Sequence, residues 1–249
     1  RRPPSRRRSS GGLAVKWGKK PPEPPLEKVD WSTVGRFVIS SQERPATRKR
    51  PSVTYGERAV RVPSGGVDAL VLSPCAYLPR LTPAERKAAV GRPDDRLRDR
   101  ILYEDPDRLR VLCTIDEPLE AGGDRHHEVR DADGRSLGTI RRVAPKRPFR
   151  HTWRIDHPGR GEITGRGEWA NRDTKGILGH AAAGLVLGLI DSAAGLGADG
   201  GDQATGRRKL EWRLGTEVVM TSKGSAEISV HADWFDRRLA FAFALIGDF

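Results

Sequence analysis

Residues 234–249 read WFDRRLAFAFALIGDF, and this last segment decides the fold of the chain. Leu239, Phe241, Phe243 and Leu245 alternate with small residues, which fits a β-strand. Alanine and leucine are also strong helix formers, and Asp233 or Asp236 is a suitable N-cap, which fits a helix. A helix that is apolar on all sides has to be buried on all sides. Either way, the segment is predicted to lie in the core.

The residues before this segment predict β-hairpins. HHEVRDADGRSLGTIRRV (126–143) has two alternating halves around Asp133-Gly134, a pair that supplies the positive φ of a tight turn. HTWRIDHPGRGEITGRGEW (151–169) repeats this plan, and 208–233 adds further alternating pieces separated by Gly and Ser-Lys-Gly turns. Residues 108–249 are therefore expected to form a mainly antiparallel β-domain, a barrel or a sandwich.

The hairpin DADGRSLGTIRR (131–142), the second hairpin and the terminal stretch 236–246 resemble the superfamily of phospholipid scramblases, tubby-like and LURP-one-related proteins. The resemblance implies a closed barrel of about a dozen strands around one hydrophobic C-terminal helix. It covers residues 109–249 and extends to strands from Phe37 onward. The chain has no counterpart of the scramblases' cysteine-rich or acidic calcium segments, and no basic residue aligns with the phosphoinositide-binding residues of tubby proteins. Lipid binding is therefore implied without named residues.

The fold class predicted is mainly β, a closed antiparallel barrel or a β-rich α+β fold, preceded by a disordered arm. Residues 1–30 form this basic, proline-rich arm, which we call the basic arm. Residues 31–107 are a mixed strand and helix segment that can supply the first part of the barrel, with a helix start at Thr82-Pro83. Residues 108–249 contain the apolar insertion 177–197 and the core segment 234–249.

The insertion ILGHAAAGLVLGLIDSAAGLG (177–197) is rich in glycine and alanine. His180 and Asp191 leave only the residues from Ala181 to Ile190 uninterrupted, whereas a membrane-spanning helix needs about 20 mostly apolar residues. The segment therefore predicts a buried or amphipathic helix rather than a membrane span.

The positive charge is concentrated at the start of the chain. The formal net charge is +12, with 16 Lys/Arg against 5 Asp/Glu in residues 1–63 and 29 against 28 in the rest. Segments of this kind bind anionic surfaces such as nucleic acid or lipid head groups, or they remain solvated tails. Two cysteines, Cys75 and Cys113, indicate neither a disulfide scaffold nor a zinc cage, and a cytoplasmic location is expected.

The sequence contains no convincing reaction centre. His126-His127-Glu128 lacks the three or four suitably spaced ligands of a zinc site, and no P-loop, G-x-S-x-G or G-x-G-x-x-G motif is present. Asp156, Glu162 and Glu168 are typical of the outer face of strands. No catalytic residue, metal site or cofactor is therefore predicted, and a non-enzymatic protein is expected.

One cluster of basic residues is the predicted binding site. RRVAPKRPFRH (141–151) gathers five cations beside Phe149 and Trp153, a composition suited to phosphate groups of lipid or nucleic acid, although a solvated loop would read the same way. The predicted anion- or lipid-binding residues are Arg141, Arg142, Lys146, Arg147 and Arg150.

These features lead to two hypotheses of different class. The first is a scramblase- or tubby-like binding module that associates peripherally with an anionic phospholipid surface, assisted by the basic arm. The alternative is a nucleic-acid-associated protein whose basic arm neutralises phosphates, although no recognition helix or stacking-aromatic motif is evident.

Overall fold

Thirteen strands form one antiparallel sheet in the part of the chain that the computed structural model describes, which is residues 24–80, 100–144, 152–167, 209–224 and 227–247. A 3-10 helix, η1 (Trp31–Thr33), precedes the sheet, and one α-helix, α3 (Arg237–Ile246), follows it. In order along the chain, the strands are β1 (Arg36–Arg44), β2 (Thr54–Ser64), β3 (Val71–Tyr77), β4 (Ile101–Tyr103), β5 (Val111–Ile115), β6 (Leu119–Ala121), β7 (Asp124–Asp131), β8 (Ser136–Val143), β9 (Thr152–His157), β10 (Gly161–Gly167), β11 (Lys209–Leu214), β12 (Glu217–Lys223) and β13 (Glu227–Val230).

The sheet closes on itself as a barrel. Most strands pair with their neighbours in sequence, β13 pairs with β1, and β5 completes the ring by pairing with β7. Twelve strands form the ring. The short strand β6 continues the path of β5 along the same edge of β7, with Ile115 opposite Val129 in the first case and Leu119 opposite His126 in the second. β1 to β4, from the segment 31–107, are thus strands of the same sheet as the hairpins that follow.

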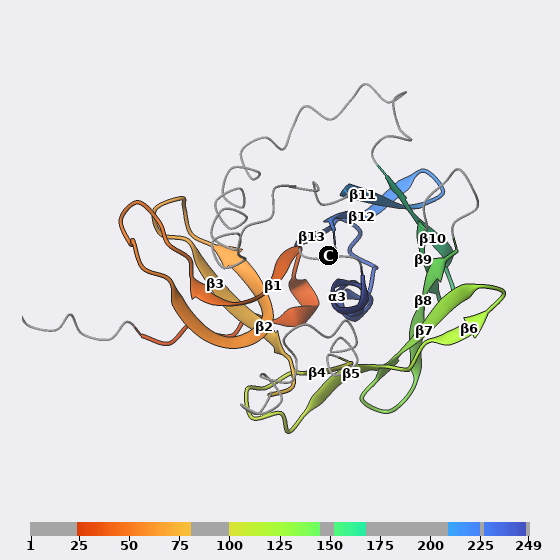
Figure 1. The fold of residues 1–249 in the computed structure, drawn as a ribbon, viewed down its shortest axis with the longest axis horizontal. Helices are drawn as coiled ribbons and strands as arrows, with labels where there is room; N and C mark the ends of the chain where they lie inside the picture. The colour runs from red at the N-terminus through yellow and green to blue at the C-terminus, as the bar shows by residue number, and fades with distance from the viewer. Residues whose placement is uncertain (1–23, 81–99, 145–151, 168–208, 225–226, 248–249) are drawn as a thin grey trace, which may run out of the picture.

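Helix α3 runs through the interior of this ring, as Figure 1 shows with the helix viewed end-on and the strands around it. Asp236 caps it by accepting a hydrogen bond from the backbone N–H of Arg238 at 2.9 Å. A strand in this position would have no backbone partner, because the ring strands already pair with one another on both sides. A helix satisfies its own N–H and C=O groups, and this resolves the ambiguity of the terminal segment. The expected barrel around a C-terminal helix is therefore confirmed.

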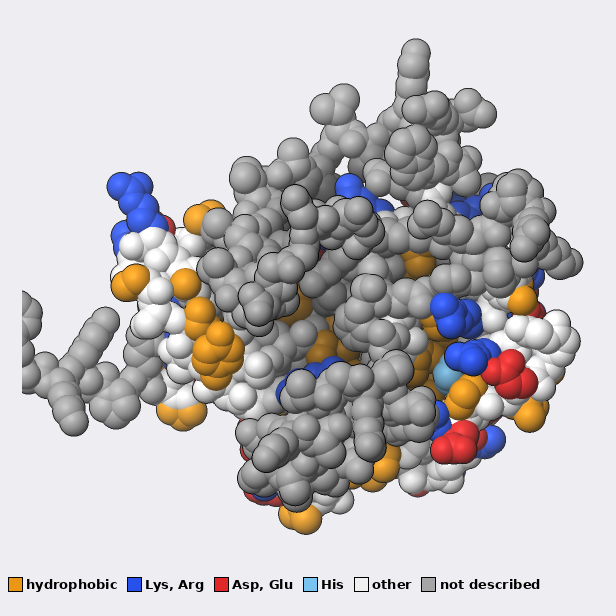
Figure 2. All heavy atoms as spheres, in the orientation of Figure 1, with side chains coloured by type: hydrophobic (Ala, Val, Ile, Leu, Met, Phe, Trp, Pro, Cys, Tyr) orange, Lys and Arg blue, Asp and Glu red, His pale blue; other side chains and the backbone are white. Residues whose placement is uncertain are grey.

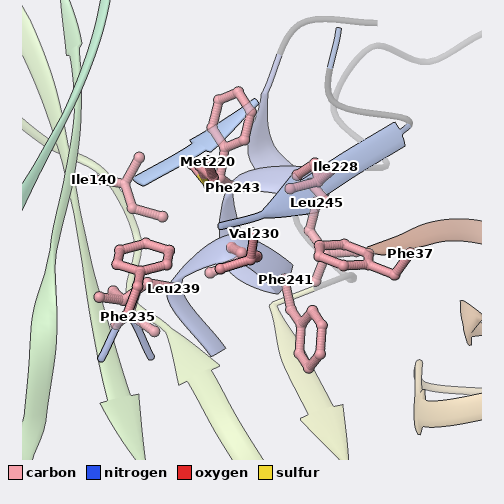
Figure 3. Close-up of a cluster of buried hydrophobic side chains, with 14 of the residues drawn as sticks. Phe37, Ile140, Met220, Ile228, Val230, Phe235, Leu239, Phe241, Phe243 and Leu245 are labelled. Carbon is pink, nitrogen blue, oxygen red and sulfur yellow. The ribbon is translucent and has the colours of Figure 1, made fainter. Parts of the chain in front are cut away.

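Aromatic side chains of the helix pack against opposite walls of the barrel (Figure 3). Phe241 meets Phe37 of β1 edge-to-face, with ring centroids 4.7 Å apart. Phe243 lies between two indoles, 4.6 Å from Trp212 of β11 and 5.5 Å from Trp153 of β9. Edge-to-face pairs of this kind add to the free energy of burial itself. All residues from Leu239 to Leu245 are buried, so the helix contributes its whole circumference to the core.

A buried arginine fixes the start of the helix. Arg237 is 7% exposed, and its guanidinium donates to the carbonyl oxygens of Val34 at 3.1 Å, Ala232 at 2.9 Å and Phe235 at 2.6 Å. A buried guanidinium is costly unless its donors are satisfied, and here backbone carbonyls satisfy them. Since Val34 lies two residues before β1, Arg237 connects the start of the barrel to the start of α3.

Two glycines lie where the backbone conformation or the surroundings favour glycine. Gly134, with φ of 79°, occupies the turn between β7 and β8, so the predicted Asp-Ala-Asp-Gly hairpin is confirmed. Gly138 lies where β8 passes closest to the helix. A Cβ there would stand 2.7 Å from the carbonyl oxygen of Asp156 and 3.3 Å from the Leu239 side chain.

The structure corrects two details predicted for the segment 31–107. The stretch WSTVGRFVI (31–39) predicts a short strand from Trp31, but Trp31 belongs to η1 and β1 begins only at Arg36. The apolar run VDALVLSPCAYLP (67–79) is predicted to break at Pro74, but β3 passes through this residue with an irregularity in the pairing opposite Val60 and Arg61. A proline is tolerated at such a bulge because no ladder hydrogen bond is required of it. The helix expected after Thr82, the insertion 177–197 and residues 1–23 of the basic arm lie outside the described residues.

Replacing Phe243 by alanine is expected to destabilise the barrel by about 3–5 kcal/mol, because the cavity left between Trp153 and Trp212 cannot collapse inside a closed ring. Phe243→Leu, which keeps most of the volume, should cost less than about 1.5 kcal/mol. Urea unfolding of both variants, followed by tryptophan fluorescence, measures the difference. Equal losses for the two substitutions would contradict the packing assigned to Phe243.

Candidate anion-binding site

The structure divides the five basic residues predicted as a binding site. Lys146, Arg147 and Arg150 lie outside the described residues. Arg141 and Arg142 are neighbours on β8 and point to opposite faces of the barrel wall, since successive side chains of a strand alternate. The two arginines therefore have different surroundings and are considered separately.

Arg141 belongs to an ion-pair network on the outer face of the barrel. Its Nε donates to Asp156 Oδ2 at 2.7 Å, and its Nη2 contacts Glu162. Glu162 also accepts from Nη1 of Arg154 at 2.8 Å. Two of the carboxylates that the sequence placed on the outer face of strands, Asp156 and Glu162, are thus the partners of these arginines, and Glu168 lies outside the described residues. Since two carboxylates already neutralise Arg141, we assign it to the barrel wall and not to a binding site.

Arg142 faces the interior and lies beside a core tryptophan. Its guanidinium carbon is 5.9 Å from the centroid of the Trp153 ring, a cation–π geometry, and Trp153 in turn packs against Phe243 of the helix. The strand partner of Arg142 across the hairpin is Arg125 of β7. The hairpin register therefore places two arginines side by side at the end of the barrel toward which the C-terminus of α3 points.

His127 and Arg100 complete this group of residues. His127 lies two residues after Arg125 on β7, hence on the same inner face, and is 9% exposed. Arg100 immediately precedes β4, and its carbonyl accepts a 2.7 Å hydrogen bond from Ile115 at the end of β5. We call the set Arg100, Arg125, His127 and Arg142 the mouth cluster. Figure 2 shows basic, acidic and histidine side chains gathered over β6 to β8 on this face, beside hydrophobic side chains.

The other residues of the mouth cluster alter the pKa of His127. The pKa of His127 is lowered to about 4, first by burial and then by the positive charges of Arg100, Arg125 and Arg142, with Glu120 acting in the opposite direction. At neutral pH the ring is therefore uncharged. Its Nδ1 atom is buried and has no hydrogen-bond partner. An unsatisfied buried polar atom costs about 1–3 kcal/mol, so the fold maintains this arrangement at a cost.

Two exposed glutamates balance part of the positive charge. Arg125 donates to Glu120 Oε1 at 2.7 Å, and Arg100 lies 3.5 Å from Glu117. The side chains of Glu120 and Glu117 are 60% and 87% exposed, so both pairs are solvated and worth at most about 1 kcal/mol each. The described ion pairs of Arg100 and Arg125 are therefore contacts at the surface and add little to stability.

Sequence reasoning missed Arg100, Arg125 and His127 as members of one site. The hairpin gave a misleading signal for Arg125, because counting back from the Asp133-Gly134 turn places it opposite Arg141. A β-bulge between Val129 and Arg130 shifts the register by one residue and brings Arg125 opposite Arg142. Arg100 had no such signal, since its position depends on β4 and β5 meeting β7 at the closure of the barrel.

Other chemical motifs are dispersed by the fold. His126 and His127 lie on opposite faces of β7, and among the described residues no three His, Cys, Asp or Glu side chains converge in a way suited to a metal ion. Cys75 and Cys113 are free and buried, and burial raises the pKa of each thiol to about 12. Within the described ranges, no helix has the length and apolar character required to traverse a bilayer.

No family model, curated protein or solved structure matches the chain. The resemblance to scramblases and tubby-like proteins therefore remains a prediction based on the sequence motifs. What can be said of the site comes from its geometry, which is a positive group of inward-facing residues at one mouth of a closed barrel.

The titration of His127 is expected to make the free energy of unfolding depend on pH. The unfolded chain binds a proton at this residue near pH 6.5, whereas the folded barrel binds it only near pH 4. Stability should therefore fall as the pH drops through this window, by about 3 kcal/mol from this residue alone. His127→Asn should lose that part of the dependence. Urea unfolding of the natural chain and of His127→Asn between pH 7.5 and pH 4 measures the free energy of unfolding of each. The difference between the two at pH 7.5 gives the cost of the lost packing. If the two free energies change in parallel with pH, the role assigned to His127 is wrong.

Proposed function

We propose that this protein is a non-enzymatic binding module that attaches peripherally to anionic phospholipid surfaces at the cytoplasmic side of a membrane. The observation that carries the proposal is the segregation of charge, since residues 1–63 hold 16 Lys/Arg against 5 Asp/Glu while the remainder is nearly neutral. A cluster of basic residues at one end of a chain is suited to the negative surface potential of the cytoplasmic leaflet.

The fold supports the proposal through the sequence resemblance. A closed barrel around one hydrophobic helix is the architecture that the resemblance to scramblases and tubby-like proteins implies, and lipid association is the activity it implies. Fold alone does not establish function, so the argument depends on the charges.

The distribution of the basic residues indicates that the basic arm is the part of the chain that would contact the membrane. Beyond residue 30, several arginines are held by the barrel, such as Arg36, which pairs with Glu227 at 2.7 Å, and the fully buried Arg61, which pairs with Glu43 at 3.3 Å. Residues 1–30 carry nine Lys/Arg against three Asp/Glu. At about 1 kcal/mol per charge, the net charge of this segment contributes about 6 kcal/mol, which corresponds to a dissociation constant on the order of tens of micromolar.

Neutralising the basic arm should abolish the attachment. The variant replaces five arginines by glutamine in the full chain, which leaves β1 and β2 in place; the positions are Arg1, Arg2, Arg6, Arg7 and Arg8. Co-sedimentation with phosphatidylcholine vesicles containing phosphatidylserine should weaken by at least about a hundredfold. A matched variant with the same five positions changed to lysine should bind as the natural chain does, because the charge is kept.

Two results would contradict the proposal. One is equal binding of the natural chain and the glutamine variant to anionic vesicles, and the other is negligible binding of both. If the natural chain instead binds DNA or RNA with an affinity that falls steeply with salt, and ignores vesicles, the nucleic-acid alternative takes its place.

A further inference from the structure

We propose that two neighbouring loops on one side of the barrel form a second contact surface for the anionic membrane, in addition to the basic arm. The loops are residues 45–53, between β1 and β2, and residues 65–70, between β2 and β3, and we call them together the double loop. The inference rests on the proposed membrane attachment and goes further, because it states which part of the barrel faces the lipid. It can fail while the attachment through the basic arm stands.

Hydrogen bonds hold the two loops against each other. Thr47 Oγ1 in the first loop donates to the carbonyl oxygen of Asp68 in the second at 3.1 Å. The guanidinium of Arg50 donates to the carbonyl oxygen of Leu70 and, at 3.0 Å, to that of Pro45. The two loops therefore form one continuous surface, although β2 separates them in the sequence.

A tight turn presents two cations at the tip of the first loop. The backbone groups of Thr47 and Arg50 bond to each other in both directions, at 2.6 Å and 3.1 Å, and this leaves Arg48 and Lys49 between them at the tip. Arg48 is exposed and makes no ion pair or hydrogen bond with any residue that the structure describes. The Lys49 ammonium is 3.5 Å from Asp68, and its side chain is 77% exposed. Because the backbone of this turn is already fixed, less entropy is lost when the two cations meet a ligand.

The double loop carries more positive than negative charge. Its cations are Arg48, Lys49 and Arg50, and its one carboxylate is that of Asp68. The guanidinium of Arg50 bonds to carbonyl oxygens, which satisfies its donors without cancelling its charge. Three cations against one carboxylate suit a surface of negative charge.

The carboxylates on the strands beside the double loop have arginine partners of their own. Glu43 of β1 lies 3.3 Å from the guanidinium of Arg61, and Glu57 of β2 lies 3.0 Å from that of Arg80. These glutamates are therefore occupied by other cations, and the positive charge of the double loop remains available to an external partner.

Exposed hydrophobic side chains accompany the cations. Among the described residues, four large hydrophobic side chains are exposed, and two of them lie here. Val67 is 48% exposed in the second loop, and Tyr55 is 64% exposed on β2, two residues after the first loop. Figure 2 shows Lys and Arg side chains beside hydrophobic ones over β1 to β3, at the left of the view.

This combination favours lipid over nucleic acid as the partner. Tyrosine is enriched at membrane–water interfaces, and an apolar side chain such as that of Val67 gains free energy by entering the boundary between head groups and acyl chains. A nucleic-acid backbone would offer its phosphates to the cations but no apolar surface to Val67.

The described part of the basic arm begins beside the double loop. Nη2 of Arg44, the last residue of β1, donates to the carbonyl oxygen of Pro24 at 2.5 Å. Arg44 immediately precedes the first loop, so the chain is held next to this surface at residue 24. A membrane that binds the basic arm would therefore lie close to the double loop, and two linked contacts bind more tightly than either alone.

Neutralising the two cations at the tip tests the proposal. R48Q combined with K49Q should weaken co-sedimentation with phosphatidylcholine vesicles containing phosphatidylserine by about thirtyfold, because two charges near the surface are lost. R48K combined with K49R keeps both charges and should bind as the natural chain does.

The matched control removes the same charge from the other side of the barrel. Arg135, in the β7–β8 turn, and Arg166, on β10, are both exposed, and these strands lie across α3 from β1 to β3 (Figure 1). R135Q combined with R166Q should weaken binding by less than about threefold, because charges farther from the lipid than a Debye length are screened. Thermal melts confirm that each variant is folded.

A fluorescent label at residue 67 tests directly whether this side of the barrel meets the lipid. Cys75 and Cys113 are buried, so a thiol-reactive nitrobenzoxadiazole label on Val67→Cys attaches to the new thiol alone. Its emission should rise and shift to the blue when the phosphatidylserine vesicles are added. The same label on Leu119→Cys, at a position on β6 that is 69% exposed, should not change.

The outcomes separate this inference from the proposed attachment. The inference alone is overturned if the natural chain binds the vesicles through the basic arm while R48Q/K49Q binds as tightly as R135Q/R166Q, or while the label at residue 67 does not respond. If the natural chain does not bind the vesicles, the attachment and the inference both fail. If the label at residue 67 responds to DNA or RNA and not to vesicles, the double loop is a nucleic-acid surface and the inference is overturned as well.

Discussion

Helix α3 is apolar around its whole circumference, and the rest of the structure depends on the burial that this requires. From Leu239 to Leu245 every side chain is buried, so no face of the helix can be turned toward water. A flat sheet would cover one side only. The pairing of β5 with β7 closes the sheet into a ring, and the ring covers every side at once. The helix in turn fills the interior of the ring with apolar side chains. It can lie there because its backbone N–H and C=O groups bond to one another and need no partners from the strands.

The polarity of the helix organises the two ends of the barrel. At the start of the helix, Asp236 accepts a hydrogen bond from a backbone N–H group, and the guanidinium of Arg237 donates hydrogen bonds to backbone carbonyl oxygens. At its other end, the carbonyl groups carry partial negative charge, and the arginines of the mouth cluster lie on that side. Burying an uncharged histidine with an unsatisfied Nδ1 atom near these arginines costs stability.

The folded barrel and the excess of positive charge belong to different parts of the sequence. The basic arm carries positive charge at one end of the sequence, while the barrel pairs most of its described arginines with carboxylates or carbonyl oxygens, as Arg141 and Arg61 illustrate. The mouth cluster is a second, smaller concentration of charge on the barrel itself.

The sequence by itself determined the local elements, because their signals are local. Asp133-Gly134 fixed the β7–β8 turn, the alternation around Trp153 and Trp212 fixed inward-facing positions, and the apolar terminal segment had to be core. The tertiary structure decided whether that segment is a helix, since only a closed ring removes every strand partner from its surroundings. The tertiary structure also decided which basic residues lie together. Arg141 and Arg142 are adjacent in sequence, yet the alternation of side chains along β8 places Arg141 in an ion-pair network on the outer face and Arg142 in the mouth cluster. Arg100 joined it only through the closure of the barrel, a contact between strands that no local pattern encodes.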